Sequence, residues 1–192
     1  MSTLVVVQKG SVAAIAADQQ TGADEDTKCL AQYKAHPTKI VRVGESYVGV
    51  SGLTAHMRVL QSLARKYADR FDLSSTDSIF ETFRGLHSVL VDEYYLTTDN
   101  NEDCQAYQSN HLNLLIANSS GIYEVQSYRE VIKYTKFWAT GSGFAFALGA
   151  MEALYDQTDM SARNIAEKGV AASCLFDRAS GPPIDCFTVD LK

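Results

Sequence analysis

The chain opens with MSTLVVVQKGSVAAIAAD, residues 1–18, in which two apolar runs flank a short polar turn. Apolar runs on either side of a turn that contains glycine are typical of a β-hairpin. A hairpin returns the chain to its starting point. We therefore expect Asp18, at the end of the second run, to lie beside Ser2, at the start of the first.

Ser2 directly follows the initiator methionine, and this position suggests a chemical role. This methionine is normally removed before a small residue, which would leave Ser2 with a free α-amine. Such an amine titrates at about pH 8, so part of it is neutral at pH 7 and can take the hydroxyl proton. Ser2 is therefore a candidate nucleophile that carries its own base.

The size and charge of the chain limit the classes of function. Its 192 residues predict a single domain, 1–192, and its formal charge of −6 argues against nucleic acid as a partner. No apolar stretch is long enough to span a bilayer and no leader-like segment is present, so neither a membrane partner nor secretion is expected. The cysteines lack CxxC spacing and are expected to be free thiols in the reducing cytoplasm: Cys29, Cys104, Cys174 and Cys186.

The order of the expected elements predicts an α+β fold. Strands are expected over residues 2–7, 12–17, 39–43, 46–50, 112–117, 122–127, 131–134 and 184–189. Apolar residues at helical spacing predict helices over 53–71, 79–94, 143–156 and 161–176. Two antiparallel sheets packed face to face, with a helix pair outside each, would bury both sheets.

Segment 2–18 resembles the N-terminus of proteasome β-type subunits and of the HslV-type peptidase. In that family an Asp follows the mature N-terminal Thr by sixteen positions, as Asp18 follows Ser2 here. Four later stretches resemble the same family in the same order along the chain: Val48–Gly52, Ala139–Gly143, Ser161–Lys168 and Asp177–Gly181.

This resemblance implies a fold and a function. The fold is the four-layer αββα sandwich of the N-terminal nucleophile hydrolases, and the branch indicated is the bacterial (betaproteobacterial) proteasome homologue. The implied function is that of a subunit of a self-compartmentalising cytoplasmic peptidase, built from stacked rings of identical subunits. Its substrates would be peptides or unfolded protein, and an ATP-dependent unfoldase is a candidate partner.

The resemblance also implies partners for the nucleophile. An Asp at the end of the second strand pairs with a Lys that opens the third, which corresponds to Asp18 and Lys39. A cation there would favour the developing alkoxide and lower the pKa of the α-amine. Lys34 is the alternative, in a less strand-like context.

Four further residues are carried over from the family. Gly49 is expected to supply the oxyanion hole through its backbone N–H, with a role in sheet packing as the alternative. Ser142, Asp177 and Ser180 resemble the residues that orient the terminal amine, although Ser142 could instead cap the helix that follows.

The sequence leaves the nucleophile open between Ser2 and Thr3. The family favours Thr, but Thr3 lies only fifteen residues before Asp18 and is followed by the bulky Leu4. A shift of one residue would also reverse the face to which every side chain of the strand points. We therefore favour Ser2, with Thr3 as the alternative.

No cofactor is expected to be required. The backbone carbonyls of Cys174, Asp177 and Ser180 could hold a structural cation, as the corresponding turn does in some HslV-type proteins, and oxygen ligands would suit a hard ion. The acidic segment 97–110 is expected to face a pore or an inner chamber.

Two other functions fit the same residues. If Met1 is retained, the amine of Ser2 is blocked and the chain would be an inactive, proteasome-like scaffold. A small-amide hydrolase that uses the same nucleophile is the second alternative.

Overall fold

The structure, a computed structural model, describes residues 2–22, 27–96, 112–126 and 130–192. Its helices are α1 Thr54–Lys66, α2 Thr76–Asp92, α3 Phe144–Tyr155 and α4 Ala162–Phe176, with short 3-10 helices η1 Ala31–Tyr33 and η2 Ala68–Arg70. Its strands are β1 Thr3–Lys9, β2 Val12–Asp18, β3 Thr21–Gly22, β4 Lys28–Cys29, β5 Ile40–Val43, β6 Ser46–Ser51, β7 Asn113–Asn118, β8 Gly121–Val125, β9 Val131–Tyr134, β10 Phe137–Gly141 and β11 Ile184–Asp190.

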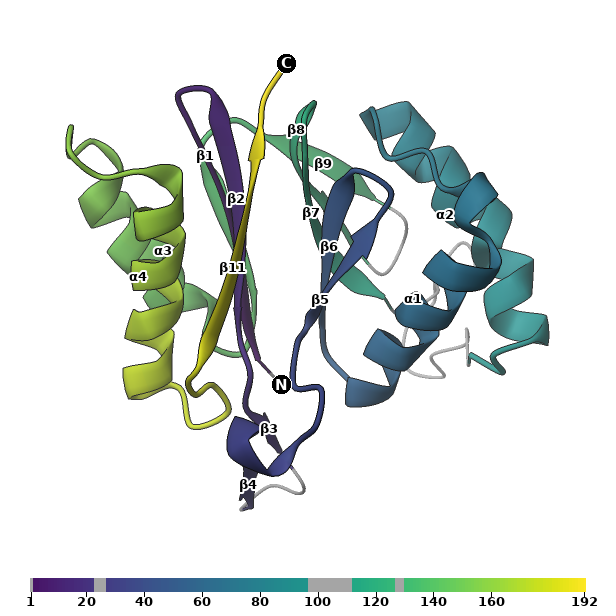
Figure 1. Cartoon of the computed structure of the whole chain (residues 1–192), viewed down its shortest axis with the longest axis horizontal. Coiled ribbons are helices and arrows are strands. Elements are labelled where there is room, and N and C mark those ends of the chain that lie inside the picture. Colours follow the sequence, from purple (N-terminus) through teal and green to yellow (C-terminus); the bar gives the residue numbers. More distant parts are fainter. Residues whose placement is uncertain (1, 23–26, 97–111, 127–129) are drawn as a thin grey trace, which may run out of the picture.

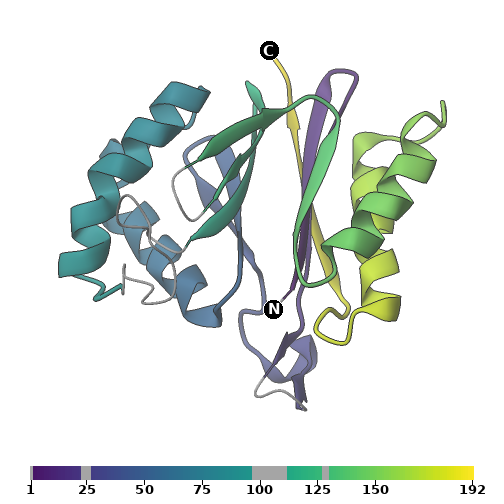
Figure 2. The ribbon, with the colours of Figure 1, turned by 180° about the vertical axis from the view of Figure 1, so that it is seen from behind.

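Two antiparallel sheets form the centre of the molecule. One has the strand order β10-β1-β2-β11 and the other β5-β6-β7-β8-β9, while β3 and β4 form a small separate hairpin. Helices α3 and α4 cover the outer face of the first sheet, and α1 and α2 cover the second (Figures 1 and 2). The four layers confirm the predicted α+β sandwich.

Strand β1 is buried on both faces, which explains its unbroken apolar sequence. Leu4 and Val6 point into the core between the two sheets, whereas Val5 and Val7 point into the core beneath α3 and α4. A strand that is covered on both sides needs apolar residues at every position rather than at alternate ones. The predicted hairpin is confirmed, because β1 pairs with β2 from Leu4 opposite Ala17 to Lys9 opposite Val12.

The helices differ from their predicted bounds for local reasons. Helix α2 begins at Thr76 rather than at 79, because the Ser75 hydroxyl caps it and accepts the Ser78 N–H at 3.1 Å. The predicted helix over 53–71 ends at Lys66 and is followed by η2. Strand β10 was not predicted, because its sequence runs directly into the glycine-rich turn that follows it.

Three of the four cysteines lie within the described residues. Within the described residues, Cys29, Cys174 and Cys186 are free thiols. Cys104 and the acidic segment 97–110 lie outside the described residues. The described helices include none with the length and apolar character needed to cross a bilayer.

Gly49 brings the two sheets into close contact. It lies in β6, and a Cβ built on it would stand 2.4 Å from Cδ1 of Leu4, on the facing sheet. Leu4 is fully buried, so its side chain cannot turn out into solvent. The absence of a side chain at Gly49 is therefore a packing requirement of the inter-sheet core.

We expect Gly49→Ala to lower the free energy of unfolding by about 1–3 kcal/mol, the usual cost of overpacking a core. Gly85→Ala is the matched control, because Gly85 lies in α2 and a Cβ there meets nothing within 4 Å. That change should be neutral or should stabilise by up to about 1 kcal/mol. Equal stabilities of the two variants, measured by denaturant unfolding, would contradict this account of the inter-sheet core.

Candidate active site

The start of β1 lies between the two sheets, at one end of the sandwich (Figure 1). A pocket of about 310 Å³ opens there, and Ser2, Lys39 and Gly52 contribute to its lining. The hairpin, the loop before β5 and the loop before α1 thus meet around one cavity.

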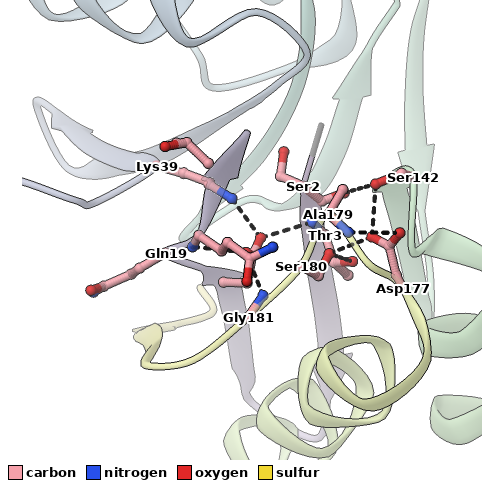
Figure 3. A network of polar contacts seen from close by, with 12 residues as sticks. Ser2, Thr3, Gln19, Lys39, Ser142, Asp177, Ala179, Ser180 and Gly181 are labelled. Atoms are coloured by element: carbon pink, nitrogen blue, oxygen red, sulfur yellow. Dashed lines mark hydrogen bonds and ion pairs between the residues drawn. The ribbon is translucent and has the colours of Figure 1, made fainter. Parts of the chain in front are cut away.

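The carboxylate of Asp18 is the centre of the polar network at this end, and Figure 3 labels its partners Thr3, Lys39 and Gly181. Its Oδ1 accepts the backbone N–H of Thr3 at 2.9 Å and the ammonium of Lys39 at 2.6 Å. Its Oδ2 accepts the backbone N–H groups of Gln20 and Gly181, each at 3.0 Å. Asp18 has no exposed surface, and these four donors fix its position and satisfy its charge.

Lys39, rather than Lys34, is the lysine that contacts Asp18. It is 8% exposed and forms an ion pair with Asp18. Burial lowers the pKa of Lys39, and the attraction of the Asp18 carboxylate partly opposes that change. Lys34, the alternative, instead donates to the backbone carbonyl of Gln19 at 2.5 Å and to the Thr21 hydroxyl at 3.3 Å.

Ser2 and Thr3, the first two described residues, point their side chains in opposite directions (Figure 3). Thr3 is fully buried, and its hydroxyl lies 2.8 Å from that of Ser180. The side chain of Ser2 points away from Ser180 and Asp177 (Figure 3), and Ser2 lines the pocket together with Lys39. This is the alternation expected of a β-strand.

Asp177 organises a second group of polar side chains. Its Oδ2 accepts the hydroxyls of Ser142 at 2.7 Å and of Ser180 at 2.6 Å, and its Oδ1 accepts the Ala179 N–H at 3.2 Å. The Ser142 hydroxyl also lies 3.4 Å from the carbonyl oxygen of Ser2. Ser142, Asp177 and Ser180 are thus assembled beside the start of the chain.

Two glycines allow this close approach. A Cβ at Gly141, where φ is +95°, would lie 2.1 Å from the Ser2 carbonyl oxygen. A Cβ at Gly143 would lie 2.2 Å from the Thr3 hydroxyl. The Gly-Ser-Gly turn can therefore pass directly against residues 2 and 3 only because both glycines lack side chains.

Gly49, the predicted oxyanion donor, is not among the residues that line the pocket. Gly49 lies within β6, paired with Ile40 on one side and Leu115 on the other, and its Cα faces Leu4 rather than the pocket. The packing role, weighed as the alternative, fits instead. Gly52 does line the pocket, and it directly precedes Leu53, the N-cap residue of α1.

Gly52 and Gln20 were missed at the level of sequence. The backbone φ of Gly52 is +111°, a conformation that favours glycine, and its place just before a helix was the available signal. Gln20 supplies a backbone N–H to Asp18, and its side-chain amide donates to the Arg178 carbonyl at 2.8 Å. No sequence pattern distinguishes it, because its role depends on a contact between distant segments.

The structural cation stays a prediction. One of its three expected ligands, the Asp177 carbonyl, accepts the Ser180 N–H at 3.1 Å. In the described ranges, no group of three or more His, Cys, Asp or Glu side chains is placed to hold a metal ion.

Comparisons with known proteins find similarity over nearly the whole chain. The family model described as "Proteasome subunit" matches residues 2–189. A proteasome subunit beta of Nanoarchaeum equitans (strain Kin4-M) is 38% identical over 90 residues, which cover 43% of this chain and 46% of the length of that relative.

Solved structures extend the similarity over the whole chain. The structure of Thiobacillus denitrificans BPH in complex with epoxomicin is 36% identical, with a TM-score of 0.88 and 99% coverage of both chains. The eukaryotic HslV from Trypanosoma brucei is 20% identical, with a TM-score of 0.75 over 98% of this chain and 99% of that one, and it shows a similar fold.

We expect Asp18→Asn to lower the free energy of unfolding by about 3–5 kcal/mol, because it leaves the buried charge of Lys39 without its partner. The matched control is Glu81→Gln, which breaks the exposed pair between Glu81 and Arg84 and should cost less than about 1 kcal/mol. Denaturant unfolding measures both. A cost for Asp18→Asn as small as that of the control would contradict the central position of this carboxylate.

Proposed function

This chain belongs to the proteasome subunit family, and from that premise we propose that it is an N-terminal nucleophile peptidase in which Ser2 attacks the peptide bond. The observation that carries the proposal is the shared pocket of Ser2 and Lys39, with Lys39 held in place by Asp18. A hydroxyl and a buried cation that line one cavity are suited to acyl transfer.

The choice of Ser2 over Thr3 rests on the two faces of β1. The Thr3 hydroxyl is buried against Ser180 and has no exposed surface, so a substrate cannot reach it without opening the core. Ser2 is itself only 2% exposed, but it lines the pocket, and its side chain points away from Ser180 (Figure 3). Removal of Met1 would then place the free amine and a hydroxyl that lies at the pocket on the same residue.

The proposed reaction has two stages. The Ser2 hydroxyl attacks the substrate carbonyl while its proton passes to the α-amine, and a tetrahedral intermediate forms. The intermediate collapses to an ester on Ser2 as the amine returns the proton to the departing nitrogen. Water then attacks the ester, with the same amine as base, and the carboxylic acid product leaves.

Three groups would assist this chemistry. The ammonium of Lys39 favours the alkoxide of Ser2 and disfavours protonation of the amine. Gly52, which lines the pocket beside Ser2 at the approach to α1, is our candidate for the oxyanion donor. The Ser142–Asp177–Ser180 group lies at the backbone of Ser2 and would orient the amine.

We also propose that the chain self-associates into stacked rings in the cytoplasm and acts on peptides or unfolded protein, with an ATP-dependent unfoldase as a candidate partner. Exposed apolar side chains at neighbouring ends of α3 and α4 support self-association, because a monomer rarely leaves such a group in water. They are Phe144, Phe146, Leu175 and Phe176, and the rings of Phe146 and Phe176 lie 5.6 Å apart.

The decisive experiment is incubation with a peptide epoxyketone followed by intact-mass and peptide mass spectrometry. This reagent must bond to both the hydroxyl and the free amine of one residue. We expect a chain without Met1 that carries one adduct, located on Ser2. Ser2→Ala should form no adduct and should not hydrolyse peptides, whereas Thr3→Ser should still form the adduct.

Other outcomes would change the assignment. An adduct on residue 3 in the parent chain would make Thr3 the nucleophile. A chain that keeps Met1 and forms no adduct would favour the inactive scaffold. An adduct combined with hydrolysis of simple amides, but not of peptides, would favour the small-amide hydrolase.

A further inference from the structure

The pocket beside Ser2 combines apolar walls with positive charge. Val50 and Met57 contribute apolar surface, and Lys34 and Arg58 contribute cationic side chains from the loop after η1 and from α1. Among the described residues that line it, none is an aspartate or a glutamate. This is unusual in a chain whose formal charge is −6.

The positive charges of Lys34 and Arg58 are not neutralised by the described part of the protein. Lys39 differs from them, because its charge is balanced by Asp18 at 2.6 Å. Lys34 donates to two neutral oxygens, and Arg58 donates to the side-chain oxygen of Gln61 at 3.3 Å. Neither residue forms an ion pair within the described ranges.

We propose that this pocket selects a glutamate side chain at the substrate residue whose carbonyl group Ser2 attacks. The inference rests on the proposed peptidase function and adds its substrate class. The methylene groups of a glutamate would contact Val50 and Met57, while its carboxylate would meet Lys34 and Arg58. A guanidinium can receive a carboxylate through two parallel hydrogen bonds, which favours a carboxylate over a neutral amide.

The expected selectivity is moderate. Arg58 is exposed and Lys34 is half-buried, so water and salt screen their attraction for a carboxylate. Exposed ion pairs of about 0.3–0.7 kcal/mol each, within their usual range, correspond to a preference of about threefold to tenfold for two cations acting together. Aspartate should be a poorer substrate than glutamate, because its shorter side chain leaves the carboxylate farther from the cations.

The first test compares fluorogenic peptides that differ only in glutamate or glutamine at this residue. We expect kcat/KM to be about threefold to tenfold higher for the glutamate peptide, with the ratio falling as salt is raised. Arg58→Gln and Lys34→Met should each lower the ratio, and the double variant should bring it to about one. Arg65→Gln is the matched control, since Arg65 is exposed on the same helix but does not line the pocket.

A second measurement separates this inference from the peptidase function. Calorimetry with Ser2→Ala reports binding of the same two peptides when no reaction is possible. Tighter binding of the glutamate peptide supports the pocket, even if the parent chain cleaves neither peptide and forms no epoxyketone adduct. Equal binding, or a glutamate preference that is the same in the double variant, overturns the inference even if peptides are cleaved.

Discussion

The site depends on one buried carboxylate, that of Asp18. It joins four segments that are distant in the sequence: the start of β1, the end of β2, the lysine before β5 and the turn before β11. A buried charge of this kind is stable only when every acceptor position is satisfied, and here four donors meet it. The same contacts that neutralise Asp18 therefore also set the position of Lys39 and of the first residues of the chain.

The alternation of side chains along the start of β1 then places Ser2 and Thr3 in different environments. The Thr3 side chain faces the packed interior and meets Ser180, while Ser2 lines the pocket. Because both faces of β1 are covered, its register cannot shift without moving buried apolar residues to the wrong layer. The hydrophobic core of the sandwich thereby specifies which of these two residues lies at the pocket.

Much of this arrangement could be predicted from the sequence. The hairpin and the α+β order of elements followed from apolar periodicity, whereas the four-layer sandwich and the pairing of Asp18 with Lys39 were implied by the resemblance to the proteasome family. The packing role of Gly49 could not be recognised, because a sequence pattern does not tell whether a glycine lacks a side chain for a neighbour's packing or for access to a pocket. Leu4, which occupies the space beside Gly49, comes from the other sheet. Gln20 and the charge of the pocket depend in the same way on contacts between remote segments.

The central claim is that Lys39, held by Asp18, keeps the α-amine of Ser2 available as a base. The most direct measurement is the pH dependence of labelling of that amine by acetic anhydride, followed by mass spectrometry, in the parent chain and in Lys39→Met. A nearby cation disfavours the protonated amine, so its pKa should lie below the ordinary value of about 8 in the parent chain and should rise when Lys39 is replaced. An amine pKa that is the same in both proteins would contradict the account.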